Sequence, residues 1–278
     1  MWTRPRKALH VFLTMDMKQC WQEMERQFCL EGKTPFGVRL PARSLISLAV
    51  PHPLDNPTMD RVLEPELMDD QEQAQAYARA DFSEENQYFI DEFCRRFPDF
   101  LSGHVVDLGC GPADIPIRLV RARPDCTVTG IDASLPMIQL GEAAIAVAQL
   151  HNRVQLRCEP IQQICLPEPA GAVISNSLLH HLPDPMDFWT AIKQVAKPAA
   201  PVLIMDLIRP ESTTAAQTIV DQYAHHTPDI LRRDFYNSLL AAFTLEEMSV
   251  QLAASGLGHF VVTQPDDRHW IAAGHLAE

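Results

Sequence analysis

The residues best suited to chemistry stand at the ends of short apolar runs, and most of them are acids, glycines or histidines. Asp107, Gly109 and Gly111 follow one such run. Glycine tolerates positive φ and lets a ligand approach the backbone, while a helix beginning near Ala113 would direct free N–H groups at the same place. We therefore expect a small-molecule cofactor to bind at this turn.

A second acid, Asp132, stands 21 residues after Gly111, at the end of the apolar segment 126–131. An acid that ends a second strand is placed to accept hydrogen bonds from ribose hydroxyls. The dinucleotide fingerprint requires Gly or Ala at its third position, where this chain has Asp114. A nicotinamide-dependent oxidoreductase is therefore the disfavoured alternative, because this carboxylate would face a pyrophosphate.

Three segments resemble motifs of the class I S-adenosylmethionine-dependent methyltransferases, with domains of types 11, 12 and 25 as the nearest forms. They are VVDLGCGPAD (105–114), VTGIDASLPMI (128–138) and AVISNSLLHHLPDP (172–185), in the order of the family. The resemblance runs from about Asp81 to the C-terminus and implies S-adenosyl-L-methionine as the cofactor. It also assigns the parts of the cofactor: the methionine end to Asp107, Gly109, Gly111 and Asn176, the ribose to Asp132, and the adenine to Ala133 and Met137.

Two departures from the family pattern concern the adenine edge, the part of the site that would bind the adenine amino group. Where many relatives carry an acid after the third strand, this chain has Cys158-Glu159-Pro160-Ile161, so Glu159 is the candidate. Ala170-Gly171 stand where a Phe-Asp pair is common. A catalytically silent cofactor-binding or partner-docking module therefore stays open as the alternative to an enzyme.

Methyl transfer from a sulfonium depends on positioning and on exclusion of water, and it needs a base only when the acceptor must lose a proton. His180 and His181 follow the fourth apolar segment, Asp206 ends the fifth, and a histidine suits a base near neutral pH. These three are the candidate catalytic residues. Two structural roles are open beside that one: a histidine that caps the turn, and an ion pair of Asp206 with Arg209.

We expect no metal site, because the histidine pairs 180–181 and 225–226 are adjacent in sequence and form no H-x-x-x-H. The insertion 210–243 is rich in polar and aromatic residues and is predicted to cap the acceptor. Its candidate substrate contacts are Tyr223, Tyr236 and Asn237, joined by Tyr77 from the helical segment that precedes the first strand.

Alternation of strand and helix patterns predicts an α/β, Rossmann-like, doubly wound seven-stranded sheet that ends in an antiparallel hairpin. Strands are expected near 104–109, 126–132, 154–159, 172–177, 200–207, 259–264 and 269–276. Helices are expected near 113–122, 134–150, 184–197 and 244–255. Thr244 and Glu247 predict a capping box.

Composition divides the chain into an N-terminal extension, 1–58, and a methyltransferase domain, 59–278. The extension carries five prolines between positions 35 and 57 and a local charge of +3, and we interpret it as poorly ordered or as a misassigned start. Within the domain we expect a helical lid (59–100), a cofactor-binding core (101–209), the substrate cap (210–243) and a closing helix and hairpin (244–278).

The net charge of −13 disfavours nucleic acid and anionic membranes as partners, since an acidic surface repels polyanions. Seven cysteines without a C-x-x-C pattern indicate reduced thiols and a cytoplasmic location. The expected partner is a small-molecule methyl acceptor of unidentified structure. The oligomeric state and the methylated atom stay open.

Overall fold

The computed structural model describes residues 59–64 and 68–278, so the prediction for residues 1–58 lies outside the described part. The helices are α2 (Gln71–Arg79), α3 (Ser83–Arg96), α4 (Asp114–Ala122), α5 (Leu135–Ala148), α6 (Pro185–Val195), α7 (Thr213–Tyr223), α8 (Asp229–Ala241) and α9 (Leu245–Ala254). The short 3₁₀ helices are η1 (Ile161–Gln163) and η2 (Leu179–His181). The strands are β1 (Ser102–Leu108), β2 (Asp125–Asp132), β3 (Val154–Cys158), β4 (Ala172–Asn176), β5 (Pro201–Leu207), β6 (Val261–Thr263) and β7 (His269–His275).

These strands form one sheet in the order β3-β2-β1-β4-β5-β7-β6. Strands β1 to β5 run parallel, whereas β7 is antiparallel to both β5 and β6. The register aligns Leu108 with Ile131 on one side and with Ser175 on the other, so the carboxyl ends of these strands meet at one edge. The predicted α/β Rossmann-like sheet with its closing hairpin is confirmed.

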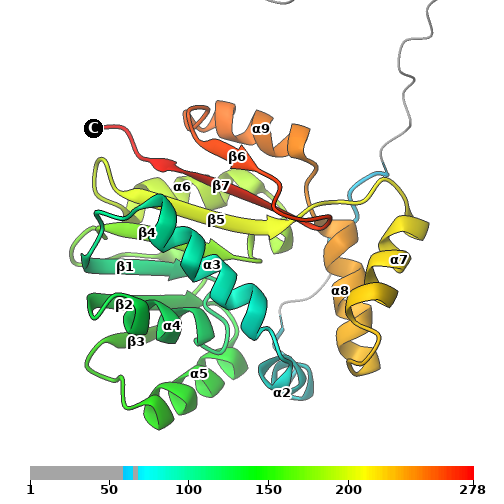
Figure 1. The fold of residues 1–278 in the computed structure, drawn as a ribbon, viewed down its shortest axis with the longest axis horizontal. Coiled ribbons are helices and arrows are strands. Elements are labelled where there is room, and N and C mark those ends of the chain that lie inside the picture. Colours follow the sequence, from blue (N-terminus) through cyan, green and yellow to red (C-terminus); the bar gives the residue numbers. More distant parts are fainter. Residues whose placement is uncertain (1–58, 65–67) are drawn as a thin grey trace, which may run out of the picture. The chain divides into compact units, whose positions relative to one another are not determined.

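Successive side chains of each strand enter different cores, as the strand period of two requires. Val106 and Leu108 pack with Phe188, Trp189 and other residues of α6 and α9 on one face. Val105 and its neighbours pack with residues of α3, α4 and α5 on the opposite face. Figure 1 shows the sheet between these two helical layers. The central strands are covered on both sides, which explains their continuous apolar runs.

Local signals fix where the helices begin. Ser134 caps α5 by accepting a hydrogen bond from the Met137 backbone N–H, and Thr244 with Glu247 forms the predicted capping box of α9. Helix α4 begins after Ala113, which adopts a left-handed φ of 68°. The N-terminus of α4, directly after the glycine turn, therefore lies at the carboxyl edge of the sheet.

The segment 210–243 folds into α7 and α8, whose apolar sides share a small core with Leu207. Figure 1 shows α2, α7 and α8 beyond the tips of the parallel strands, where ligands of open α/β sheets bind. Within residues 59–64 and 68–278, no helix is both long and apolar enough to cross a membrane.

Candidate functional site

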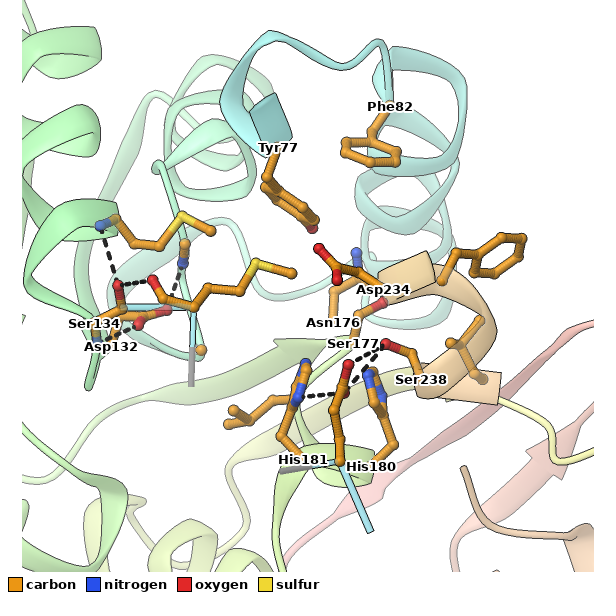
Figure 2. Close-up of a pocket in the computed structure, with 18 of the residues that line it drawn as sticks. Tyr77, Phe82, Asp132, Ser134, Asn176, Ser177, His180, His181, Asp234 and Ser238 are labelled. Atoms are coloured by element: carbon orange, nitrogen blue, oxygen red, sulfur yellow. Dashed lines mark hydrogen bonds and ion pairs between the residues drawn. The ribbon is translucent and has the colours of Figure 1, made fainter. Parts of the chain in front are cut away.

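A cavity of about 600 Å³ lies at the carboxyl edge of the sheet, between the strand tips and the helices α2 and α8. In Figure 2, Asp132 and Ser134 stand on one side of it, while His180, His181 and Ser238 stand on another. Tyr77 and Phe82 lie across from the histidines, and their rings stack with centroids 4.9 Å apart. Ten of the residues predicted from the sequence line the cavity: Tyr77, Gly109, Gly111, Asp132, Ala133, Met137, Asn176, His180, His181 and Tyr223.

Asp132 holds the glycine turn in place. One carboxylate oxygen accepts the Gly111 N–H at 2.9 Å, and the other accepts the Ser134 N–H at 2.8 Å. Gly109 and Gly111 have φ of +74° and +50°, and a Cβ on Gly111 would meet nothing within 4 Å. Burial raises the pKa of Asp132, although these two hydrogen bonds oppose the shift. The turn therefore presents open backbone and an acid to a ligand.

Asp107 lies behind this turn and does not line the cavity itself. Its side chain is buried, and its Oδ2 has no hydrogen-bond partner among the described residues. Burial, followed by the nearby charge of Asp132, raises the pKa of Asp107 well above its ordinary value. A buried carboxyl without a partner is costly unless a donor or a cation approaches it. This is an observation that fits a cofactor with an amino group at the turn.

The predicted adenine edge is only partly as the sequence indicated. Ala133 and Met137 line the cavity, but Glu159 does not: its carboxylate pairs with Arg157 at 2.5 Å. The cavity wall there consists of Pro160, Ile161 and Gln162 instead. Gln162 is a polar residue that the sequence did not single out.

His180 and Asp206 form a buried pair, with His180 Nδ1 2.5 Å from Asp206 Oδ1. Asp206 also accepts the Leu179 N–H at 2.7 Å and so holds η2 against the end of β5. The pair lowers the pKa of Asp206 despite burial, and it raises the pKa of His180 despite burial. The alternative pairing of Asp206 with Arg209 is wrong, because Arg209 binds Glu247 at 2.6 Å.

His181 has a different partner, which the sequence did not indicate. Its Nδ1 lies 2.8 Å from Glu64 Oε2, and Ser238 Oγ lies 3.3 Å from the same oxygen. The His181 side chain is 22% exposed and that of Glu64 8% exposed, so the couple stands at the cavity wall. The ring of His181 also lies against that of His180, at 4.1 Å between centroids.

Arg61 fixes the segment that carries Glu64. Its guanidinium donates to the carbonyl oxygens of His180 and Leu182, both at 2.8 Å, and to that of Ala241 at 2.5 Å. The same group lies 4.0 Å above the centroid of the Phe243 ring. Residues 59–64, which we call the strap, are thus tied to η2 and to the end of α8.

The segment 210–243, the predicted cap, contributes through one face of α8. Leu231, Asp234, Phe235 and Ser238, spaced three or four residues apart, line the cavity. Tyr236 does not line it and packs instead among the apolar residues shared by α7 and α8. Asn237 is also absent from the lining, so the structure does not bring these two predicted contacts to the cavity. Along α8, Tyr236 and Asn237 lie on a different side of the helix from the residues that line the cavity.

Asp234 is a further polar residue of α8 at the cavity. It is buried, and its Oδ2 accepts a 2.8 Å hydrogen bond from Gln73 of α2. In Figure 2 its carboxylate points into the space between Tyr77 and the histidine turn. Burial, followed by the charges of Asp132 and Asp114, raises the pKa of Tyr77 to about 12, so this phenol stays a hydrogen-bond donor.

Three possible metal donors also meet here, although none was expected. Single donor atoms of Glu64, His180 and His181 lie within 4.8 Å of one another. Hydrogen bonds already occupy Nδ1 of both histidines, one to Asp206 and one to Glu64. Coordination through those atoms would first have to break these contacts.

Comparison with known proteins identifies the part of the chain that holds the glycine turn. Residues 105–199 match the family model described as a methyltransferase domain. The demethylmenaquinone methyltransferase of Lactiplantibacillus plantarum is 29% identical over 112 residues, which cover 40% of this chain and 47% of that protein. The ubiquinone biosynthesis O-methyltransferase of Pseudomonas putida F1 is 34% identical over 112 residues, 38% of this chain and 44% of that protein. The matches thus span less than half of each relative.

Solved structures share the fold over more of the chain. A SAM-dependent methyltransferase from Aquifex aeolicus has a TM-score of 0.53 and 17% identity, over 75% of this chain and 99% of that one. The plantazolicin methyltransferase BpumL, in complex with a pentazolic desmethylPZN analog and SAH, has a TM-score of 0.59 and 12% identity. That likeness covers 75% of this chain and 91% of that one. At such identities the likeness concerns the fold.

Proposed function

The chain carries a class I S-adenosylmethionine-dependent methyltransferase domain, and we propose that it transfers a methyl group from S-adenosyl-L-methionine to a small molecule held in the cavity. The observation that carries the proposal is the pairing of Asp132 with the Gly111 turn, close in sequence to Asp107, whose buried Oδ2 has no hydrogen-bond partner among the described residues. An open glycine turn backed by an unsatisfied acid suits a ligand with an amino acid end.

The site offers a place for each part of this cofactor. Gly109, Gly111 and Asn176 would line its methionine end, with Asp107 as the countercharge to the amino group. Asp132 would accept hydrogen bonds from the ribose, although its oxygens already bind two backbone N–H groups. The adenine would lie against Ala133 and Met137, with Gln162 in place of Glu159 at its edge.

The bound cofactor supplies an electrophilic methyl group. The residues of this chain orient the reactants and exclude water. Tyr77 and Phe82 cover the turn from the lid, while Leu231 and Phe235 form apolar walls on the cap side. Such walls exclude water from the reacting atoms and orient the acceptor for in-line attack. The residues 59–100 and 210–243 would therefore act as the lid and the substrate cap.

The catalytic candidates divide into two roles. His180 and Asp206 are buried together and hold η2, so we assign them to positioning. His181 stands at the cavity wall and is the candidate that could touch an acceptor. Tyr223 lines the cap side of the cavity and is a proposed acceptor contact, whereas Tyr236 and Asn237 are not proposed again as direct contacts.

Two measurements test the proposal in order. Titration calorimetry should show binding of S-adenosylhomocysteine, the demethylated product, to the full chain. Incubation of radiolabelled cofactor with a metabolite extract should then transfer label to a small molecule. Absence of binding at millimolar product would remove the proposal.

The alternative is a silent module that binds the cofactor or docks a partner without turnover, and the unusual adenine edge favours it. Binding of the product without transfer of label to any component of the extract would support this alternative. We also propose a cytoplasmic location, because Cys94, Cys110, Cys126, Cys158 and Cys165 are free thiols, as is usual in a reducing compartment.

A further inference from the structure

The polar side of the cavity is assembled from parts of the chain that lie far apart in sequence. Glu64 comes from the strap, His181 from η2 and Ser238 from the cap helix α8. Their shared contacts are a 2.8 Å ion pair and a 3.3 Å hydrogen bond on one carboxylate oxygen. The Glu64 side chain is 8% exposed, so little of it is open to solvent.

We propose that Glu64 and His181 form a proton-accepting couple and that the methyl acceptor is a hydroxyl on an aromatic or enolic small molecule. This inference rests on the proposed methyl transfer and specifies its substrate class. Glu64 acts here as a positioning residue, because it orients His181 without touching the reacting atoms. His181 is the catalytic residue of the couple.

Glu64 determines which ring nitrogen of His181 is available. Burial raises the pKa of Glu64, but the hydrogen bond and the charge of His181 outweigh burial, and the net shift is downward. An ionised Glu64 accepts a hydrogen bond from Nδ1–H, which leaves the lone pair of Nε2 for a proton from a ligand. Carboxylates orient histidine bases in this way in several unrelated hydrolases.

The charged groups around His181 come from four elements. Glu64 faces it from the strap, His180 from η2 itself, Asp206 from the end of β5 and Asp132 from β2. Three of these four are acids, and the Arg61 guanidinium adds a positive charge nearby. Arg61 donates to neighbouring carbonyl groups and keeps the strap, with Glu64, against this turn.

The rest of the cavity favours a largely apolar acceptor. Its lining includes Leu178 and Leu182, on either side of the histidines in sequence, and Leu231 and Phe235 from α8. Ligand cavities commonly combine such apolar walls with a few polar groups that fix orientation. A phenol or enol is also an acid that an imidazole can deprotonate during attack, whereas an alkyl alcohol is far weaker.

The step balances without another reactant. The O–H proton of the acceptor passes to His181 Nε2, and an oxygen lone pair forms the new O–C bond. The electron pair of the broken S–C bond stays on sulfur, which becomes a neutral thioether. The positive charge of the sulfonium thus reappears on His181, next to Glu64, until solvent removes the proton.

The test uses the full chain with catechol, phenol and thiophenol as acceptor probes. Wild-type protein should methylate at least one of the two hydroxyl probes. Glu64→Gln and His181→Gln should lower that rate by about 100-fold, the usual size of a general-base contribution. Thiophenol, which is ionised at neutral pH without help, should be affected much less.

A pH profile separates a base from a structural role. In His181→Gln the rate on a hydroxyl probe should rise about tenfold per pH unit, because only acceptor ionised by solvent reacts. The wild-type rate should depend far less on pH over the same range. Glu64→Asp, which keeps the charge, should retain more activity than Glu64→Gln. Matched controls are Glu72→Gln and His151→Gln, at exposed positions outside the cavity lining.

The results that overturn the inference are distinct from those that overturn the function. Product binding together with transfer to thiophenol but to neither hydroxyl probe would refute the substrate class. Equal pH dependence in wild type and His181→Gln would refute the base. Loss of transfer on chelation, with recovery on added zinc or magnesium ions, would assign Glu64, His180 and His181 to a metal instead. Absence of product binding would remove the proposed function itself.

Discussion

At the scale of single residues, Asp132 shows how one side chain can serve both the fold and a ligand. Its two oxygens each accept a backbone N–H, from Gly111 and from Ser134. A carboxylate oxygen can accept more than one hydrogen bond, so capacity remains for ribose hydroxyls. The charge strengthens every one of these bonds.

We predict that Asp132→Asn weakens the binding of S-adenosylhomocysteine by about 1.5–3 kcal/mol, the usual range for hydrogen bonds to a charged group. Titration calorimetry measures this loss. The unfolding free energy should also fall, because the amide can satisfy only one of the two backbone donors. Unchanged affinity in a folded variant would place the ribose elsewhere.

The pKa of Asp107 leads to a prediction in which stability and binding change in opposite directions. Because the folded protein raises this pKa, it binds the proton more tightly than the unfolded chain does. Stability from this group is therefore lost as the pH rises from 3.8 through the raised value. Asp107→Asn should raise the melting temperature near neutral pH.

The same variant should bind the product at least about tenfold more weakly, because an amide gives no countercharge to the amino group. Wild-type affinity should decline as the pH falls through the raised pKa of Asp107, and the variant should lack that decline. Calorimetric titrations at several pH values measure both. A variant that is less stable, or equal in affinity, would contradict this account.

Residues that lie within motifs were predictable from the sequence, whereas residues that act through distant contacts were not. Gly109, Gly111 and Asp132 follow strands at fixed spacings, and those spacings alone bring them to one edge. Glu64 precedes the first strand and meets His181 across 117 positions, without periodicity or motif. Asp206 was placed correctly, but its partner depends on which face of β5 its side chain occupies.

At the scale of elements, the glycine turn and η2 are in direct contact. A Cβ on Gly109 would lie 2.8 Å from Cβ of Leu178, the residue immediately before η2, and the φ of Gly109 is +74°. A substitution there would disturb the cofactor turn and the histidine turn together. A Cβ on Gly111 would meet no neighbouring atom, so Gly111 has only the positive φ in common with Gly109.

We therefore predict that Gly109→Ala lowers the unfolding free energy by about 2–4 kcal/mol, from left-handed strain plus overpacking. Gly111→Ala should cost only about 1–2 kcal/mol, from the strain alone. Both should weaken product binding, because each substitution disturbs the backbone of the turn that lines the cavity. Denaturant unfolding compares the pair, and equal losses would show that Leu178 moves aside freely.

The strap allows a sharper test, because its arginine binds backbone rather than ligand. Arg61→Lys keeps the charge but cannot reach the carbonyls of His180, Leu182 and Ala241 together. We expect a loss of about 1–3 kcal/mol in unfolding free energy, the cost of unsatisfied buried acceptors. Methyl transfer should fall while product affinity stays close to wild type. A large loss of product affinity would show that the strap also supports the cofactor turn.

Element types were predictable because the two faces of the sheet are both covered, which gives long apolar runs for β1, β4 and β5. The predicted strand 104–109 is observed as Ser102–Leu108, and 200–207 as Pro201–Leu207. The contacts of the predicted cap were not predictable in this way. Tyr236 and Asn237 were proposed as substrate contacts from composition alone. The phase of α8, set by packing on α7, directs Asp234 and Ser238 to the cavity instead.

At the scale of the whole molecule, the described residues from 59 onward contain every group used in the proposed reaction. The strap, the sheet and the segment 210–243 belong to the same compact unit. Among the described residues, the strap stands nearest in sequence to the predicted N-terminal extension.

We predict that a chain beginning at Met59 retains product binding, methyl transfer and nearly the full melting temperature, because Arg61 and Glu64 remain. A chain beginning at Gln71 keeps the glycine turn and Asp132 but loses the strap. It should still bind the product, yet transfer to a hydroxyl probe should fall by about 100-fold, as for Glu64→Gln. Calorimetry and radiolabel transfer on the two chains compare these effects. If the chain from Met59 fails to bind or to transfer, residues 1–58 take part in the site; if the chain from Gln71 transfers normally, His181 needs no carboxylate partner.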